Sequence, residues 1–220
     1  MKSLSFITMM LFSYVSLFGQ LRGSGIIVNK QYDFTNFDKL ELLDLDGTIT
    51  VEIGQKWSIL VAIDENLLPL LAFDENKSET KLHIFFKDNK NNNKYIENTN
   101  INIKITMPEA SVIKHNGNSK LFVHDIVGRY LGIENGSNAT TTLSGSIDQL
   151  DVKNTGNGNL IADQLTTKVA DIKCTGNGNV KVNIVDKIKA RVSGNGSVFN
   201  SGKAIFENSS TIGNGRLIQQ

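Results

Sequence analysis

The chain has 220 residues, of which 40% are hydrophobic and 20% charged, with a formal net charge of +1 at pH 7. This near-neutral balance gives no electrostatic basis for binding nucleic acid or an anionic membrane surface. A single cysteine excludes an intrachain disulfide, and 19 glycines with abundant Asn, Ser and Thr favour short strands and tight turns over long helices.

Residues 1–19 have the layout of a secretory signal peptide. Lys2 is the only charged residue before Arg22, and residues 4–18 are almost wholly apolar or small. One positive charge before an apolar run of about fifteen residues is typical of an export signal, whereas a spanning helix needs roughly 20 apolar residues. The sequence therefore predicts export to the periplasm, the cell surface or the extracellular space, with no membrane span after the signal is removed.

Residues 30–110 contain short runs in which apolar and polar side chains alternate. Ile101, Ile103 and Ile105 alternate with polar neighbours, a period of two that places one face of a strand in a core. We expect irregular, antiparallel-style strands here, with a short helical turn at 64–69 and a solvated, Asn-rich loop at 88–94. The expected strands are 40–45, 48–53, 58–63, 70–73, 82–87 and 100–107.

The second half of the chain repeats. A glycine in a Gly-Asn-Gly or related turn recurs every 18 to 20 residues, at Gly117, Gly136, Gly156, Gly176, Gly194 and Gly213. A period near 20 residues in a soluble chain indicates a solenoid. Glycine permits the positive φ that such a turn needs, and the asparagines of stacked turns can hydrogen-bond laterally to one another.

Apolar side chains lie four and six positions to either side of these glycines, as Ile172 and Val180 do around Gly176. Side chains alternate across a strand, so these positions share one face in every repeat. Each repeat is thus predicted to be strand, turn, strand. A leucine-rich horseshoe has a similar period, but its consensus is missing. We predict an all-β, right-handed parallel β-helix with an irregular β-rich N-terminal portion.

Several segments occur in an order typical of one bacterial family. They are residues 37–40, 47–54, 81–84 and 101–108, followed by the recurring Gly-Asn-Gly turns. In these segments the chain resembles the family described as "putative auto-transporter adhesin, head GIN domain", whose members are secreted proteins of Gram-negative bacteria. The resemblance implies a single β-helix domain over residues 34–219, after a lead segment at 20–33.

An Asp-x-Asp-Gly-Thr string runs from Asp44 to Thr48 and matches the nucleophile motif of haloacid-dehalogenase-type phosphatases. In those enzymes one carboxylate attacks phosphorus and Mg²⁺ is held between carboxylates. That chemistry needs a parallel α/β sheet, whereas here Thr48 enters another strand and helical periodicity is lacking. The string instead predicts a strand–turn–strand hairpin at Asp46-Gly47.

The remaining chemistry-bearing residues also favour structural roles. No helix follows the Gly-Asn-Gly turns, as a phosphate site would need, and calcium-binding β-rolls have nine-residue repeats. His83, His115 and His124 lack the spacing of metal ligands. We predict no metal and no cofactor, with His115 in the core or at its rim and Cys174 as a small buried side chain.

Charged side chains occupy the outward positions of three successive repeats. We name this set the charged ladder: Asp151, Lys153, Asp171, Lys173, Lys189 and Arg191. Pectin-cleaving β-helices carry similar groups in a groove, but alternating charges on an outward face are more often a solvated surface. We predict no catalytic residues, and the charged ladder is our candidate ligand-facing surface.

The main hypothesis is a non-enzymatic, exported cell-envelope or surface protein, an adhesin-like module that binds an envelope or extracellular glycan or another protein. A structural scaffold without a specific ligand is one alternative, and a polysaccharide-active β-helix enzyme is another. The ligand, the binding face and the oligomeric state are left open at this stage.

Overall fold

The computed structural model describes residues 21–90, 93–94 and 96–220, so the expected signal peptide lies outside the described residues. The first strands are β1 (Leu21–Arg22), β2 (Ile27–Tyr32), β3 (Lys39–Leu45), β4 (Thr48–Ile53), β5 (Ser58–Asp64), β6 (Leu71–Asn76), β7 (Lys81–Phe86), β8 (Ile96–Glu97) and β9 (Asn102–Met107), with 3₁₀ turns η1 (Leu68–Leu70) and η2 (Lys77–Glu79). They are followed by β10 (Val112–Gly117), β11 (Lys120–Ser137), β12 (Thr140–Gly156), β13 (Leu160–Gly176), β14 (Val180–Gly194), β15 (Val198–Asn200), β16 (Ser210–Gly213) and β17 (Leu217–Gln219).

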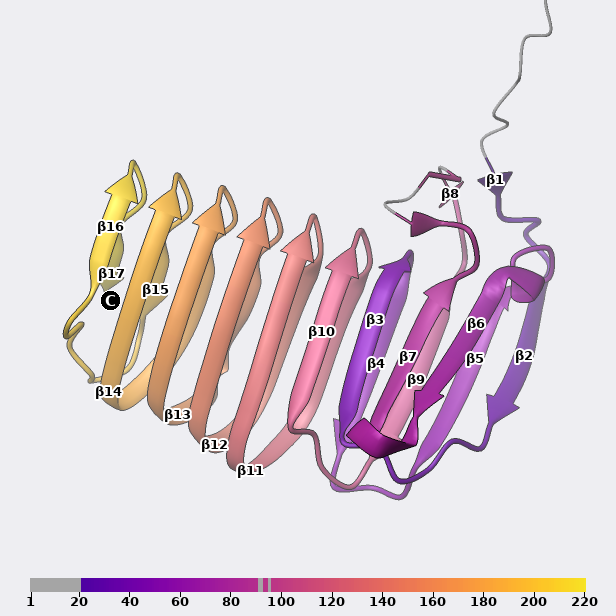
Figure 1. Cartoon of the computed structure of the whole chain (residues 1–220), viewed down its shortest axis with the longest axis horizontal. Coiled ribbons are helices and arrows are strands. Elements are labelled where there is room, and N and C mark those ends of the chain that lie inside the picture. Colours follow the sequence, from indigo (N-terminus) through magenta and orange to yellow (C-terminus); the bar gives the residue numbers. More distant parts are fainter. Residues whose placement is uncertain (1–20, 91–92, 95) are drawn as a thin grey trace, which may run out of the picture.

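The C-terminal half is a right-handed parallel β-helix, as predicted (Figure 1). In Figure 1 the front strands run upward, the chain turns over the top and returns down the back, and each coil lies further left than the one before. The long strands β11 to β14 each continue from a back strand through the lower bend into the next front strand. Neighbouring coils pair in parallel, β11 with β12, β12 with β13, and β13 with β14.

The inside of the coils is filled by stacked rows of aliphatic side chains. Leu150, Ala170 and Ile188 are in register on the front strands, and all are buried. Leu160 and Val180 begin the matching row on the back strands. Full burial of one aliphatic side chain stabilises the fold by about 1.5–3 kcal/mol. The apolar positions four and six residues from each repeat glycine therefore supply the core.

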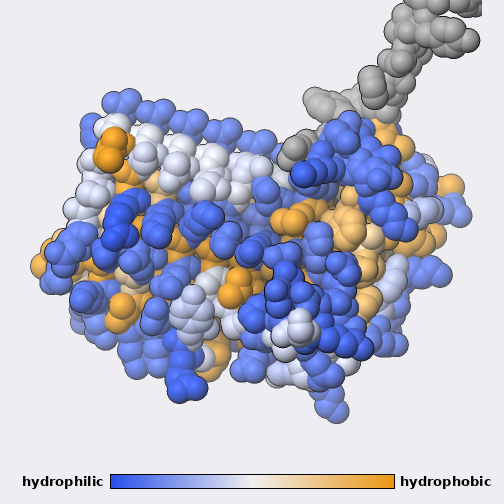
Figure 2. All heavy atoms as spheres, in the orientation of Figure 1, coloured by the Kyte–Doolittle hydropathy of each residue, from blue (hydrophilic) through white to orange (hydrophobic). Residues whose placement is uncertain are grey.

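The turns at the top of the coils stack into a ridge. We name its six stacked side chains the asparagine ridge: Asn118, Asn138, Asn157, Asn177, Asn195 and Asn214. From Asn138 onward, each Nδ2 donates to the Oδ1 of the preceding asparagine over 2.8–3.2 Å. The lateral bonding expected from the sequence is confirmed, and in Figure 2 the ridge is the hydrophilic row along the upper edge.

The N-terminal portion is interleaved rather than sequential. On the front, β7 lies between β6 and β3, and β3 also pairs with β10. On the back, β9 lies between β5 and β4, and β4 also pairs with β11. The expected antiparallel pairing is observed for β2 with β5, β5 with β9 and β6 with β7. The pairs β3 with β7 and β4 with β9 are parallel.

The predicted hairpin at Asp46-Gly47 is wrong. β3 and β4 do not pair with each other, because they lie on opposite faces of the same coil. Gly47, with φ of 84°, forms the corner between them. A Cβ at this position would lie 2.3 Å from the carbonyl oxygen of Ile101, so the corner needs glycine for its close contact with the next coil.

Other local expectations are close to the observed structure. A helical turn was expected at 64–69, and the 3₁₀ turn η1 lies at the C-terminal end of this range, at Leu68–Leu70. The loop at 88–94 is not wholly solvated: buried Asn89 donates from Nδ2 to the Asp44 carbonyl (3.0 Å) and accepts from the Lys94 amide (3.0 Å). The lead segment also contains a strand that the sequence did not reveal, β2, antiparallel to β5. Within the described ranges, no helix has the length and hydrophobicity needed to span a membrane.

Candidate functional site

The charged ladder lies on the outer surface of the front sheet, as predicted. Asp151, Asp171 and Lys189 form one row across β12, β13 and β14. Lys153, Lys173 and Arg191 form the parallel row two residues further along each strand. None of these residues is buried. The repeat therefore converts a sequence spacing of 18 to 20 residues into direct cross-strand neighbours.

Ion pairs join most of the ladder. Arg191 Nη1 lies 3.5 Å from Asp171 Oδ1, and Lys189 Nζ lies 4.0 Å from Asp171 Oδ2. Lys153 Nζ lies 3.6 Å from Glu134 Oε2. Exposed pairs of this kind stabilise by only about 0–1 kcal/mol, so a ligand can displace them at little cost. Lys173 has no ion pair or side-chain hydrogen bond within the described part of the chain.

A depression of about 310 Å³ lies beside the charged ladder. Its lining includes Val112, Tyr130, Gly132, Glu134, Asp151, Lys153 and Lys173. Gly132 stands in register with Asp151, so the missing side chain leaves a gap in the row. A Cβ at Gly132 would lie 3.1 Å from the Tyr130 hydroxyl oxygen, so a side chain here would crowd the end of the tyrosine.

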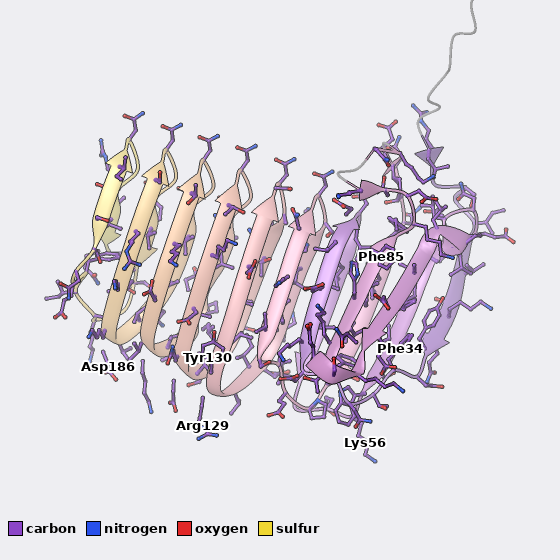
Figure 3. The ribbon with its side chains drawn as sticks, viewed as in Figure 1. Phe34, Lys56, Phe85, Arg129, Tyr130 and Asp186 are labelled. Carbon is purple, nitrogen blue, oxygen red and sulfur yellow. The ribbon has the colours of Figure 1, made fainter. Side chains whose placement is uncertain are left out.

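Tyr130 gives the depression an aromatic wall at the lower end of the front face (Figure 3). Its side chain is exposed, and its hydroxyl donates to Asp151 Oδ2 over 3.3 Å. Partial burial, together with the charge of Asp151, raises the pKa of Tyr130, so the phenol stays a neutral donor at physiological pH. A second hollow of about 340 Å³ shares Glu134 and Lys153 with the first and extends it toward the turns.

Sequence reasoning missed Tyr130 and Gly132 as part of the site. Tyr130 stands apart from other aromatics in the sequence, which gave no reason to place it beside the charged ladder. The usable signal is the register: Gly132 occupies the outward position that Asp151 and Asp171 fill in the next two coils. A small residue in an otherwise long-chained row predicts a local hollow.

A buried hydrogen-bond network lies behind this face. His115 Nδ1 and Thr141 Oγ1 are 2.8 Å apart, and Thr141 Oγ1 donates to Asn135 Oδ1 over 2.7 Å. Thr141 therefore accepts from His115 Nδ1, which leaves Nε2 to accept from Ser119 Oγ at 2.8 Å. Burial lowers the pKa of His115 to about 4, so the ring is neutral at physiological pH.

This Ser–His contact is structural rather than catalytic. Ser119 and His115 are only 1% and 0% exposed, so no substrate reaches the hydroxyl. The ring is oriented by a threonine, and no carboxylate completes a triad. The expected core position of His115 is thus confirmed. So is that of Cys174, which is buried in the same inward column and has its pKa raised by burial.

The histidines do not converge. Across residues 21–90, 93–94 and 96–220, no three His, Cys, Asp or Glu side chains gather as metal ligands would. His83 stacks on Phe85 with ring centroids 4.3 Å apart, and His124 Nδ1 lies 3.1 Å from Ser144 Oγ. Each therefore has a local packing or hydrogen-bonding role.

Solved structures share this fold at low sequence identity. A "putative adhesin" from Bacteroides fragilis is 18% identical, with a TM-score of 0.69 and coverage of 91% of this chain and 100% of that one. A "putative adhesin" from Parabacteroides distasonis is 19% identical, with a TM-score of 0.53 and coverage of 91% and 99%. A "putative lipid binding protein" from the same species is 16% identical, with a TM-score of 0.53 and coverage of 91% and 99%.

A comparison with curated proteins gives no significant match. The family model described as "Putative auto-transporter adhesin, head GIN domain" matches residues 36–204, which spans the interleaved N-terminal portion and most coils of the β-helix. The chain therefore belongs to the auto-transporter adhesin head GIN domain family.

Proposed function

We propose that this protein is an exported, non-enzymatic binding module of the cell envelope or surface, which holds an extended glycan or protein ligand on its front sheet. The observation that carries the proposal is the depression at Gly132, where exposed Tyr130 lies beside carboxylates and the unpaired cation Lys173. The family name and the adhesin titles of similar folds support a binding role.

The chemistry of the face suits recognition. Tyr130 offers an apolar ring with a polar tip, which can stack on a sugar or pack against a side chain. Lys173 and Lys153 supply cations, while Asp151 supplies acceptors for ligand hydroxyl or amide groups. These groups project from strands fixed by ladders on both sides, so the site is held in shape before a ligand arrives.

Glycan-array and pull-down assays against envelope fractions test this proposal. We expect a bound glycan or protein whose affinity falls at least tenfold in the variants Tyr130→Ala and Lys173→Glu. Lys181→Glu is the matched control, because Lys181 is an exposed lysine on the back strand of β14. Absence of any envelope ligand, or binding that ignores both front-face variants, would refute the proposal.

Two further assays separate the alternatives. Light scattering over a wide concentration range checks the scaffold alternative, in which the protein assembles instead of binding a separate ligand. Incubation with polyuronates and neutral glycans, followed by detection of new reducing ends or unsaturated products, checks the enzyme alternative. Fractionation of cells checks export: we expect the mature chain in the periplasm, on the cell surface or in the medium.

A further inference from the structure

The back sheet carries a hollow of about 650 Å³, roughly twice the volume of the front depression. It lies over β2, β5, β9 and β4, on the far side of the molecule from the charged ladder. One row of its floor runs Asn29, Ala62, Asn102 and Thr48 across the four strands. The small Ala62 side chain between two asparagines opens a notch, as Gly132 does in the front face.

Of the uncharged polar side chains that line this hollow, Gln31 donates from Nε2 to Asp33 Oδ1 over 3.2 Å, and four others are unused. Asn29, Asn102, Thr48 and Thr50 make no side-chain hydrogen bond within the described part of the chain. By contrast, the asparagines of the ridge bond to one another, and buried Asn135, Asn154 and Asn200 bond to the core backbone. Unpaired amides and hydroxyls that converge on a hollow are available to a ligand.

The charges of the hollow are largely neutralised. Lys104 Nζ lies 2.8 Å from Glu52 Oε1, and Lys104 belongs to the second row of the floor, which runs Gln31, Leu60, Lys104 and Thr50. In that row Leu60 is 47% exposed and stands between Gln31 and Lys104, so an apolar patch lies among polar groups. Lys30, on the edge strand β2, is in register with buried Val61, so its side chain projects from the opposite face of the sheet.

We propose that this hollow, here named the back groove, is a second ligand site that takes a neutral oligosaccharide lying across the strands. The planar amides of Asn29 and Asn102 can each donate to one sugar hydroxyl and accept from its neighbour. Thr48 and Thr50 add hydroxyls, and Leu60 with Ala62 presents an apolar surface to the C–H face of a pyranose.

An extended peptide fits this site less well. Peptides that bind sheets add a strand at an edge and satisfy their backbone through the ladder, whereas the back groove crosses the face of four paired strands. An acidic sugar gains little, since the Glu52 carboxylate, 2.8 Å from Lys104 Nζ, would repel its charge. The proposal goes beyond the function assigned to the front sheet, because it uses other residues on the opposite face.

Isothermal titration with neutral hexasaccharides of glucose, xylose and mannose, and with hexagalacturonate, tests the back groove. We expect at least one neutral hexasaccharide to bind, and Asn102→Ala and Ala62→Phe to weaken that binding at least tenfold. Both positions face outward, so thermal unfolding of each variant should match the parent protein. Thr142→Ala, in the outward row beyond Phe122, is the matched control and should bind as the parent does.

The back-groove variants separate the two sites. Asn102→Ala and Ala62→Phe should weaken neutral hexasaccharide binding while leaving the front-sheet ligand found by the glycan arrays bound as in the parent protein, and the titration stands even if the front sheet has no ligand at all. Binding of hexagalacturonate alone, binding of peptides alone, no binding of any neutral hexasaccharide, or neutral binding that survives both back-groove variants would each overturn the proposal.

Discussion

His115 links a single buried ring to the pH dependence of stability. Its pKa is about 4 in the fold because burial disfavours the charged form, against about 6.5 for an exposed histidine. The unfolded chain therefore binds more protons between these values. The neutral ring contributes stability that is fully present above pH 6.5 and is lost as pH falls toward 4, by about 3 kcal/mol in total.

We predict that denaturant unfolding, measured from pH 7 to pH 4, shows this loss in the parent protein and not in His115→Gln. The glutamine variant is less stable at pH 7, because burying the flexible glutamine side chain between Ser119 and Thr141 costs more conformational entropy than burying the imidazole ring. Its free energy of unfolding should nevertheless fall less steeply with acid. Parallel curves for the two proteins would show that another group carries the pH dependence.

Asp64 is a fully buried carboxylate that ties separate segments together. Its Oδ1 accepts from the amide of Gly25 over 2.7 Å, and its Oδ2 accepts from the amide of Asn100 over 2.6 Å. Asp64→Asn replaces one acceptor by an NH₂ group that faces a backbone N–H. We expect a loss of about 2–3 kcal/mol in the free energy of unfolding.

The control for this change is Asp74→Asn, since Asp74 is exposed on β6. That variant should differ from the parent by less than about 0.5 kcal/mol. Equal urea midpoints for Asp64→Asn and Asp74→Asn would mean that the buried carboxylate does not hold these segments in place.

At the scale of the element, glycines at the corners between strands are needed where a Cβ would clash with the neighbouring coil. A Cβ at Gly178 would lie 1.8 Å from the carbonyl oxygen of Gly158 in the preceding coil. At Gly54, with φ of 87°, a Cβ would meet nothing within 4 Å. Gly178→Ala should therefore destabilise by at least about 2–3 kcal/mol through overpacking. Gly54→Ala should lower the free energy of unfolding by only about 1 kcal/mol, because alanine is strained at a positive φ. Similar urea midpoints for Gly178→Ala and Gly54→Ala would contradict this account.

In the asparagine ridge, the loss of stability should scale with the number of side-chain hydrogen bonds that a substitution removes. Asn177 donates to Asn157 and accepts from Asn195, whereas Asn214 donates to Asn195 without accepting from another asparagine. Asn177→Ala removes two side-chain hydrogen bonds, each of which contributes about 0.5–1 kcal/mol to the free energy of unfolding in this exposed position, and Asn214→Ala removes one. Thermal melts should rank the parent above Asn214→Ala and Asn214→Ala above Asn177→Ala, and an inverted rank would rule out a cooperative ridge.

The elements differ in how far the sequence could predict them. The coils from β10 onward follow from spacing alone, because each pairs with the segment one repeat away. The sequence did not predict that β7 pairs with β3 and β9 with β4. The alternation of apolar and polar residues in a strand indicates which face is buried, but not which distant strand it pairs with. The charged ladder came from the same spacing, while Tyr130 and the back groove depend on cross-strand neighbours that only coordinates give.

At the scale of the whole molecule, the β-helix is nearly one-dimensional. β12 pairs with a coil on each side, whereas among the described residues β16 pairs only with β14, and β17 only with β15. All four residues of β16 are exposed. In such an array stability is close to a sum of coil and interface terms, so a coil with one neighbour opens before a coil with two.

Hydrogen exchange followed by mass spectrometry tests this one-dimensional behaviour. We predict that, within the coils from β10 onward, amides of β16 and β17 exchange first and those of β12 and β13 last. Gly178→Ala should speed exchange in β13 and β14 and toward β17, while β2 and β5, which share no contact with that corner, keep the parent rate. Uniform acceleration along the chain would show instead that the interleaved N-terminal portion and the coils unfold as one cooperative unit.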